Sequence, residues 1–348
     1  MKRVFISQGW KKRGAEVALK NLLLGLQDLE NCTLLNLGEK KFDIPNLKEI
    51  NIPLYGVSRI FGVFRLFKYI VYRVNRNTTF YYVNGKIFDF SLLIFLLQIF
   101  NFPIKLVVWE HCIPEKHWTE RNKFISKIIE HTYMYILNYS TKIFVPSAII
   151  AHTIPEFVDK IKIINNPLRI SLDGGYNEEV NALIDSQKIN IVFVGAISHE
   201  KRPDLFVNII KELYKKDNRV VGHIFGDGPL KDSILLDINA RGFQSVIKIH
   251  NWTPHIHKII NRSECLLVTS EFETFCNVIA EAIFLGCPVF TTQWYGVKDI
   301  YGNQIDYLSD SILQNVDSII SKIYSRKFCI VENEQYLLNI NEYISNEF

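Results

Sequence analysis

Short runs of β-branched and aromatic residues alternate with longer segments of helical periodicity along most of this chain. Such alternation is typical of βαβ units built around a parallel sheet. The first half predicts strands at residues 3–7, 32–37, 79–83, 104–110, 141–145 and 160–164. Residues 165–188 then interrupt the alternation with the polar sequences NNP and DGG, which predicts a linker at residues 166–188.

The alternation resumes at residue 189 and continues to about residue 292. The helix predicted first in this part begins at Pro203, and Leu205, Phe206, Ile209 and Leu213 recur in it at helical spacing. The second half predicts strands at residues 191–195, 220–226, 246–250, 265–269 and 288–292, and helices at residues 203–214, 230–241, 254–262 and 277–285.

This pattern predicts an α/β protein of two Rossmann-like domains that face each other across a cleft. The expected domains are residues 1–165 and residues 189–325, joined by the linker at 166–188. Residues 326–348 are expected to form a helical tail that packs back on the first domain. A length of 348 residues fits two domains better than one.

Composition excludes several other classes. The net charge of 40 − 36 = +4 is too small to indicate nucleic-acid binding by itself. The six cysteines show no paired C-x-x-C spacing, so we expect reduced thiols and no metal site. The apolar run at the N-terminus is too short for a signal peptide, and residues 91–102 are too few for a membrane span and predict a buried helix. We therefore expect a cytoplasmic protein.

The stretch TSEFETFCNVIAEAIFLGCPV, at residues 269–289, carries the most specific chemistry. Glu273 lies in a loop after a predicted strand, and the next helix begins near Asn277. The backbone N–H groups of Asn277, Val278 and Ile279 are expected to bind a phosphate at this helix start. Glu281, one turn later, can accept both hydroxyls of a ribose, and Glu273 can hold sugar hydroxyls.

This stretch resembles the Glu-x7-Glu motif of the retaining glycosyltransferases of family 4, which have the GT-B fold. Thr274 and Cys276 replace the two loop glycines of that motif. The resemblance implies that Glu273 contacts the transferred sugar, that Glu281 binds the ribose and that Phe275 belongs to the donor site. The matching residues are Ser270, Glu273, Phe275, Glu281, Ala282, Gly286, Pro288 and Val289.

Residues 192–207, VFVGAISHEKRPDLFV, are similar to the segment in which this family neutralises the donor diphosphate. Gly195 and Lys201 match the family, but Ala196 stands where the family usually has an arginine, and Arg202 is expected to compensate. An exposed basic loop is the alternative for Lys201 and Arg202. FGDGPL, at residues 225–230, is similar to a Gly-x-Gly-Pro turn of the family, although a tight turn alone explains its glycines.

Two segments of the first half match the family less specifically. RGAEVALKNLL resembles a Gly-Gly-Ala-Glu segment, which places Gly14 near the donor phosphates and Glu16 near the acceptor, although an ordinary helix start explains Glu16 equally well. VVWEHCIP, at residues 107–114, ends a predicted strand and places His111 where many members have a histidine that faces the transferred sugar, although a lone histidine is more often structural. The resemblance covers most of the chain from Gly14 to Gly302.

A basic segment, RIFGVFRLFKYIVYRVNR at residues 59–76, mixes cations with large apolar side chains. It predicts either an amphipathic helix that lies on an anionic membrane surface or a core helix with a basic outer edge. Lipid-linked acceptors, which are common in the family, favour the membrane. The cations are Arg59, Arg65, Lys68, Arg73 and Arg76.

The resemblance implies transfer of a sugar from a nucleotide-sugar donor, with UDP favoured over GDP, to a glycan or lipid-linked saccharide in bacterial surface polysaccharide synthesis. The nucleotide sugar is then a substrate, and no metal or other cofactor is expected. Two alternatives stay open, a nucleotide-sugar epimerase of the same fold and an inactive transferase fold that binds a membrane surface. A dinucleotide-dependent dehydrogenase is disfavoured because no G-x-G-x-x-G follows a strand.

Overall fold

The computed structural model describes residues 2–10, 14–54, 59–74, 77–83, 87–113, 122–172 and 178–325. These residues form two compact units, with the boundary between Pro167 and Leu168. The helical tail predicted at residues 326–348 lies outside the described residues. The predicted linker, residues 166–188, contains one short helix, α6 (Glu178–Leu183), in its described part.

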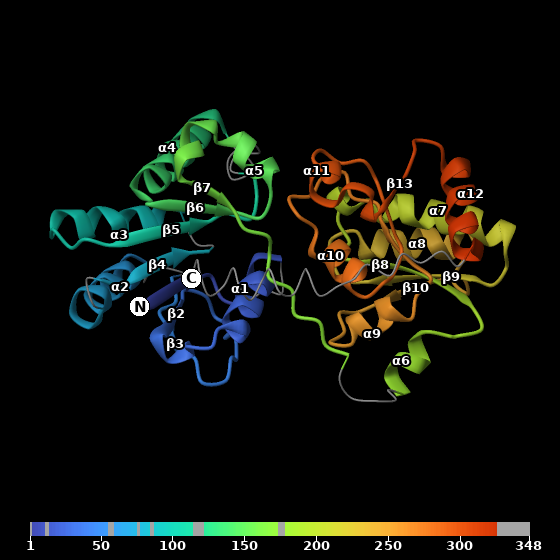
Figure 1. Ribbon diagram of the computed structural model, residues 1–348, viewed down its shortest axis with the longest axis horizontal. Coiled ribbons are helices and arrows are strands. Elements are labelled where there is room, and N and C mark those ends of the chain that lie inside the picture. Colours follow the sequence, from blue (N-terminus) through green and yellow to red (C-terminus); the bar gives the residue numbers. More distant parts are fainter. Residues whose placement is uncertain are drawn as a thin grey trace. The chain divides into compact units, whose positions relative to one another are not determined.

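The described residues of the first unit form a parallel sheet of seven strands in the order β3-β2-β1-β4-β5-β6-β7 (Figure 1). Arg3 in β1 pairs with Cys32 in β2 on one side and with Thr79 in β4 on the other. The strands are β1 (Arg3–Ser7), β2 (Cys32–Asn36), β3 (Lys48–Asn51), β4 (Thr79–Tyr82), β5 (Lys105–Trp109), β6 (Lys142–Val145) and β7 (Ile161–Ile163). The helices are α1 (Gly14–Gly25), α2 (Arg59–Arg73), α3 (Ile87–Ile99), α4 (Lys123–Tyr139) and α5 (Ala148–Thr153).

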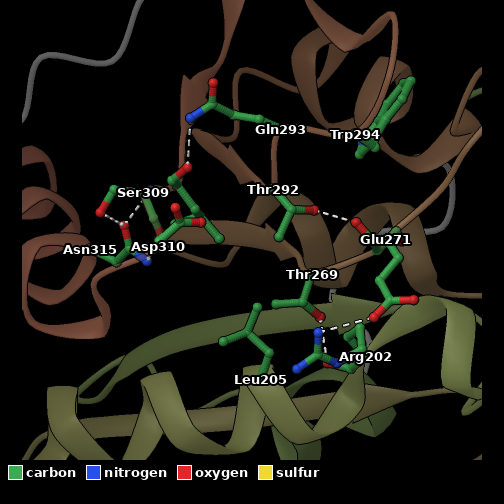
Figure 2. Close-up of a pocket in the computed structure, with 12 residues that line it drawn as sticks. Arg202, Leu205, Thr269, Glu271, Thr292, Gln293, Trp294, Ser309, Asp310 and Asn315 are labelled. Atoms are coloured by element: carbon green, nitrogen blue, oxygen red, sulfur yellow. Dashed lines mark hydrogen bonds and ion pairs between the residues drawn. The ribbon is translucent and has the colours of Figure 1, made fainter.

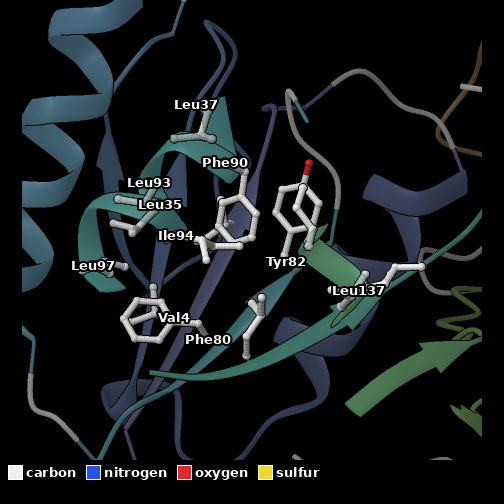
Figure 3. Packing of buried hydrophobic residues seen from close by; sticks show 14 of the residues in the cluster. Val4, Leu35, Leu37, Phe80, Tyr82, Phe90, Leu93, Ile94, Leu97 and Leu137 are labelled. Carbon is white, nitrogen blue, oxygen red and sulfur yellow. The ribbon is translucent and has the colours of Figure 1, made fainter. Parts of the chain in front are cut away.

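Both faces of this sheet are buried, because successive side chains of a strand point to opposite faces. Val4, Phe80 and Val108 belong to the core on the face covered by α2, α3 and α4, part of which is shown in Figure 3. Phe5 and Tyr81, their neighbours in β1 and β4, belong to the core on the face covered by α1. Continuous apolar strands such as RVFIS and TFYY therefore fit a sheet with helices on both sides.

The helix α3 differs from the sequence-based expectation. Residues 91–102 predicted a buried helix, but only one side of α3, with Phe90, Leu93 and Leu97, lies in the core. Phe95 and Ile99 on its other side are 52% and 58% exposed. Because the helix is apolar all round, its sequence could not distinguish the buried side from the exposed side.

The described residues of the second unit form a parallel sheet of six strands in the order β10-β9-β8-β11-β12-β13. Its strands are β8 (Ile189–Val194), β9 (Val220–Phe225), β10 (Ile247–His250), β11 (Cys265–Val268), β12 (Val289–Thr291) and β13 (Asp306–Tyr307). Its further helices are α7 (Pro203–Lys216), α8 (Lys231–Ala240), α9 (Ile256–Asn261), α10 (Asn277–Phe284), α11 (Val297–Tyr301) and α12 (Ile312–Ser325). The side chains of α7, α8 and α12 share one core with Ile191, Ile224 and Leu267 of the sheet.

A polar cluster lies on the other face of this sheet. His223 in β9 is 3% exposed, and its Nδ1 lies 3.1 Å from Nε2 of His250 in β10. Its Nε2 lies 3.2 Å from Oδ1 of Asn190, whose amide nitrogen donates to backbone carbonyls. The pKa of His223 is lowered to about 3, mainly by burial and also by the charges of His250 and Lys248. His223 is therefore neutral in the folded protein at neutral pH.

This cluster predicts an acid-sensitive contribution to stability. Below pH ~6.5 the His223 of the unfolded chain gains a proton, whereas that of the folded chain stays neutral until about pH 3. The contribution of neutral His223 to the free energy of unfolding is thus fully present above pH ~6.5. It is lost as the pH falls, by about 2 kcal/mol at pH 5. His223→Gln should lose less unfolding free energy between pH 7.5 and 5 than the unmodified chain, as measured by urea denaturation. Equal losses in both proteins would contradict this, and His152→Gln, at an exposed site, is the control.

Candidate functional site

Most of the predicted donor residues follow β8 and β11, two neighbouring strands in the second sheet. From β8 the chain continues outward through β9 and β10 on one side, and from β11 it continues through β12 and β13 on the other. The order of strands therefore reverses between β8 and β11. In open parallel sheets, ligands bind at the carboxyl ends of the strands at such a reversal.

The segments after these two strands are joined by an ion pair. Lys201 lies in the 3-10 turn His199–Lys201 after β8, and its Nζ lies 2.5 Å from Oε1 of Glu273, after β11. The hydroxyl of Ser270 donates to the same carboxylate oxygen at 2.8 Å. Burial is the largest single influence on the pKa of Lys201 and would lower it, but the charge of Glu273, the effect of Cys276, the hydrogen bond to Glu273 and the effect of Glu200 together raise this pKa. Both side chains of the ion pair are mostly buried, 24% and 11% exposed, so the pair is shielded from solvent.

Backbone contacts hold the same two segments together. The hydroxyl of Thr269 lies 2.9 Å from the carbonyl oxygen of Lys201 and 2.8 Å from that of Arg202. The amide of Glu271 donates to the carbonyl of Glu200 at 2.8 Å. The position of Lys201 relative to Glu273 is therefore fixed by the backbone as well as by charge.

Arg202 does not share the surroundings of Lys201. Its guanidinium contacts the carboxylates of Asp204 and Glu271, at 2.9 Å and 3.1 Å. It lines a cavity of about 420 Å³, which also borders Trp294 and Asn315 and is shown in Figure 2. Lys201 is not among the residues that line this cavity. Two carboxylates thus hold the Arg202 guanidinium, and a role beside Lys201 at a diphosphate stays a prediction.

The helix α10 begins at Asn277, where the sequence predicts an anion site. Asn277 and Val278 are the first two residues of α10, and Cys276 precedes them with φ of 64°, in the left-handed region. The amide of Ile279 donates to the carbonyl of Cys276 at 3.0 Å, so it is used within the first turn. Phosphate binding by the amides of Asn277 and Val278 stays a prediction.

The side chain of Phe275 is part of the core. Its side chain is 1% exposed and packs against Tyr301, with ring centroids 6.0 Å apart. The Tyr301 hydroxyl donates to the carbonyl of Phe275 at 2.5 Å and lies 3.1 Å from that of Cys276. Phe275 therefore anchors the loop before α10 from the inside.

Gly195 directly follows β8, and the space beside its Cα is open. A Cβ added to Gly195 would meet no atom within 4 Å, whereas one added to Gly226 would lie 1.9 Å from the Gly195 carbonyl oxygen. The glycines of FGDGPL are thus required by close backbone approach, because a Cβ at Gly228 would also lie 2.4 Å from the carbonyl oxygen of Ile197. Ala196, which replaces the family's arginine, is exposed.

Glu281 lies on the second turn of α10, with its side chain 13% exposed. Its Oε2 is 3.8 Å from Nε2 of His257 in α9. No pattern in the sequence predicts that His257 is a neighbour of Glu281, because the two residues come from different helices.

The first unit holds the three other predicted residues, on segments that follow β1 and β5. Gly14 is exposed at the first position of α1, and the Glu16 side chain is buried two residues later. His111 follows β5, next to Glu110, which accepts hydrogen bonds from the amides of His111 and Cys112 at 3.0 Å. Because the strands are parallel, these segments share one edge of the sheet.

The turn that carries His111 is fixed by buried groups. Besides the two amides, Glu110 accepts a hydrogen bond from the hydroxyl of Tyr133 in α4. Both ring nitrogens of His111 are buried, and burial lowers its pKa to about 4, against the opposing charge of Glu110. The imidazole is therefore neutral at physiological pH.

Neither a candidate metal site nor a membrane-spanning helix occurs among the described residues. No group of three or more His, Cys, Asp or Glu side chains in this part of the chain is arranged to hold a metal ion. No helix in the same residues is long and apolar enough to cross a membrane.

Comparison with known proteins agrees with this arrangement. Residues 177–325, which contain Lys201, the Glu273 loop and α10, match the family described as Glycosyl transferases group 1. This match covers 149 of the 348 residues of the chain. The two parallel-sheet domains of the chain are those of the GT-B fold.

Similar proteins include a 2-deoxystreptamine N-acetyl-D-glucosaminyltransferase of Niallia circulans, which is 27% identical over 139 residues. That alignment covers 39% of this chain but only 36% of the relative. An uncharacterised glycosyltransferase of Methanocaldococcus jannaschii is 24% identical over 74% of this chain and 67% of its own. The crystal structure of Anabaena HepE in complex with UDP-glucose superposes with a TM-score of 0.79 at 16% identity, covering 99% of this chain and 98% of HepE.

The Lys201–Glu273 pair predicts a coupling that thermodynamic measurements can detect. Removing one partner leaves the other charge partly buried, so Lys201→Met and Glu273→Gln should each destabilise the protein, and the double variant should lose less than their sum. We expect a coupling energy of about 1 to 3 kcal/mol from urea denaturation of the four proteins.

The control is the more exposed pair of Lys215 and Glu212 on α7, 2.6 Å apart. Its coupling should be at most about 0.5 kcal/mol. Equal coupling in the two pairs would contradict a special role for Lys201 and Glu273 in holding the segments together.

Proposed function

We propose that this protein is a retaining glycosyltransferase that moves a sugar from a nucleotide-sugar donor to a glycan or lipid-linked saccharide. UDP-sugars are favoured over GDP-sugars as donors. The observation that carries the proposal is the meeting of Lys201, Glu273 and the start of α10 at the strand reversal between β8 and β11. UDP-glucose bound by HepE, a protein of the same fold, supports the choice of donor.

The donor nucleotide is assigned to groups of the second unit. The carboxylate of Glu281 accepts hydrogen bonds from the ribose hydroxyls, and the amides of Asn277 and Val278 bind the diphosphate. The ammonium of Lys201 supplies positive charge beside it, while the open backbone at Gly195 allows close approach. Gly14 in the first unit is proposed to approach the same phosphates.

The transferred sugar is assigned to Glu273 and His111, and the acceptor to the region of Glu16. In the reaction the bond between sugar C1 and the diphosphate breaks, and its electron pair leaves with the nucleoside diphosphate. The acceptor oxygen bonds to C1 on the face that the diphosphate leaves, and the proton of the acceptor hydroxyl passes to an oxygen of the leaving diphosphate. Lys201 and the helix start stabilise the negative charge that develops on the leaving diphosphate.

The ion pair with Glu273 supports the proposed role of Lys201 at the diphosphate. The lysine ammonium already contacts Glu273, so it can hold a phosphate oxygen and the sugar-binding carboxylate at the same time. An ammonium has three donors, and only the Glu273 oxygen is recorded as a hydrogen-bond acceptor for it among the described residues. This arrangement supports a role in which the ammonium of Lys201 aligns the sugar and the diphosphate on the two sides of the donor bond that breaks.

The first test of the proposal is transfer by the full chain from labelled UDP- and GDP-sugars to a bacterial lipid extract. Glu273→Ala and His111→Ala should each lower transfer by ~10² to 10³ but leave the dissociation constant of UDP nearly unchanged, because contacts to the reacting sugar act on the transition state. Glu271→Ala, an exposed carboxylate two residues away, is the matched control and should transfer normally.

The outcomes separate the alternatives. Transfer at the unmodified rate by either variant would show that its residue is structural. Release of rearranged free sugar would identify an epimerase, and nucleotide binding without any turnover would identify an inactive fold. The anomeric configuration of the product, read by NMR, tests retention.

We also propose that the protein lies on the anionic inner face of a cell membrane, where a lipid-linked acceptor resides. The helix α2 buries Val63, Leu66 and Ile70 in the core, as the core-helix alternative expects. Its outer side nevertheless exposes Phe61 and Phe64, at 72% and 50%. Next to α2, the helix α3 exposes further apolar side chains, and Phe67 of α2 contacts Phe100, with ring centroids 5.1 Å apart.

Basic and apolar side chains thus share the outer side of α2, where Arg65, Lys68 and Arg73 are exposed. Cations near an anionic surface contribute ~1 kcal/mol each, and exposed aromatic rings add apolar burial. This combination supports peripheral binding to a membrane. Arg76 lies outside the described residues, and nothing is assigned to the side chain of Arg59.

Charge reversal tests this proposal. A variant with Arg65, Lys68 and Arg73 all changed to Glu should sediment less with phosphatidylglycerol liposomes, and high salt should have the same effect on the unmodified chain. A variant with the exposed residues Lys188, Lys215 and Lys216 changed to Glu controls for net charge and should sediment normally. Equal sedimentation of the two variants would leave α2 as a core helix.

A further inference from the structure

The short helix α9 connects the start of the second unit to α10. On one side it contacts residues 168–183. The backbone amide of Ser171 donates to Nδ1 of His257 at 3.2 Å, and Nε2 of His255 lies 3.1 Å from Oε2 of Glu179. Arg262, just after α9, donates to Oδ1 of Asn181 at 2.5 Å. Residues 168–183, which follow the unit boundary, are therefore contacted at three points by His257 of α9 and by the two residues that flank this helix.

On its other side α9 runs along α10. His257 faces Glu281, with 3.8 Å between Nε2 and Oε2, and Asn261 donates to the carbonyl of Leu285 at 3.3 Å. The two contacts are four residues apart in both segments, a spacing that places residues on one side of a helix. α9 therefore presents His257 to the carboxylate proposed to bind the ribose.

The contact with Ser171 determines which nitrogen of His257 carries hydrogen. A backbone N–H can only donate, so Nδ1 of His257 must accept with its lone pair. The hydrogen of the neutral ring is then on Nε2, the nitrogen that faces Glu281. One imidazole thus accepts from the segment after the unit boundary and presents an N–H to Glu281.

We infer that His257 is a positioning residue for Glu281. At 3.8 Å the contact is too long for a direct hydrogen bond, so the N–H dipole acts on the carboxylate electrostatically. Both side chains are largely buried, 17% and 13% exposed, which strengthens this interaction relative to water. By limiting the orientations of Glu281 before the nucleotide binds, His257 reduces the side-chain entropy lost on binding. This inference rests on the proposed function of Glu281.

Two near-isosteric substitutions separate the contacts of His257. The amide of Gln reaches the place of Nε2, so His257→Gln keeps a donor near Glu281 but loses the acceptor for Ser171. The shorter His257→Asn keeps an acceptor near Nδ1 and loses the donor near Glu281. In calorimetric titrations with UDP, His257→Asn should raise the dissociation constant about tenfold, and His257→Gln should change it by less than about threefold.

The matched control is His255→Asn, two residues away, since His255 contacts Glu179 and not Glu281. It should bind UDP normally. Glu281→Gln serves as the reference, and combining it with His257→Asn should add little further loss, because His257 acts through Glu281. Circular dichroism melting curves of all variants exclude loss of fold as the cause.

The outcomes distinguish this inference from the proposed function. If Glu281→Gln binds UDP as the unmodified chain does, the ribose assignment fails, and this inference fails with it. If Glu281→Gln weakens binding but His257→Asn does not, or if His257→Gln loses as much affinity as His257→Asn, only the role of His257 is overturned.

A measurement on the unmodified chain keeps the test valid if His257→Asn does not fold. The ring nitrogens of His257 can be observed by 1H–15N NMR and assigned by their absence from His257→Gln. We expect a neutral ring with hydrogen on Nε2 and a change in the Nε2 resonance on addition of UDP. The opposite tautomer, or no change at saturating UDP, would overturn the inference.

Discussion

The ion pair between Lys201 and Glu273 joins the ends of two strands that are distant in sequence and adjacent in the sheet. The arrangement of the candidate donor site depends on this junction. Thr269 and Glu271 reinforce it by contacts to the backbone of residues 200–202. The buried side chains of Phe275 and Tyr301 fix the loop before α10 from the core side. Contacts within the second unit therefore fix the relative positions of the cation, the carboxylate and the helix start.

Much of the second unit could be predicted from its sequence, because its strands are short, apolar and separated by helices of regular period. β8, β9 and β11 begin and end within about two residues of their predicted bounds. β3 was missed because Lys48–Asn51 is a partly exposed edge strand with the sequence KEIN, which lacks an apolar run. β13 was missed because two residues are too few to form a pattern.

The residues of the site could be named from the motif, but their contacts could not. The neighbouring residues Lys201 and Arg202 look equivalent in sequence, yet one contacts Glu273 and the other contacts Asp204 and Glu271. Arg202 adopts φ of 49° just before Pro203, and this turn directs the two side chains to different surroundings. His257 carries no motif and becomes visible only when α9 packs against α10.

The proposed function places the donor nucleotide at the carboxyl ends of β8 and β11. Hydrogen–deuterium exchange of the full chain with and without UDP tests this most directly, because it needs no substitution and reports on every amide. We predict slower exchange with UDP in residues 195–202 and 269–281, and no change in the edge strand β3. Protection confined to other parts of the chain, with both segments unaffected at saturating UDP, would contradict the account.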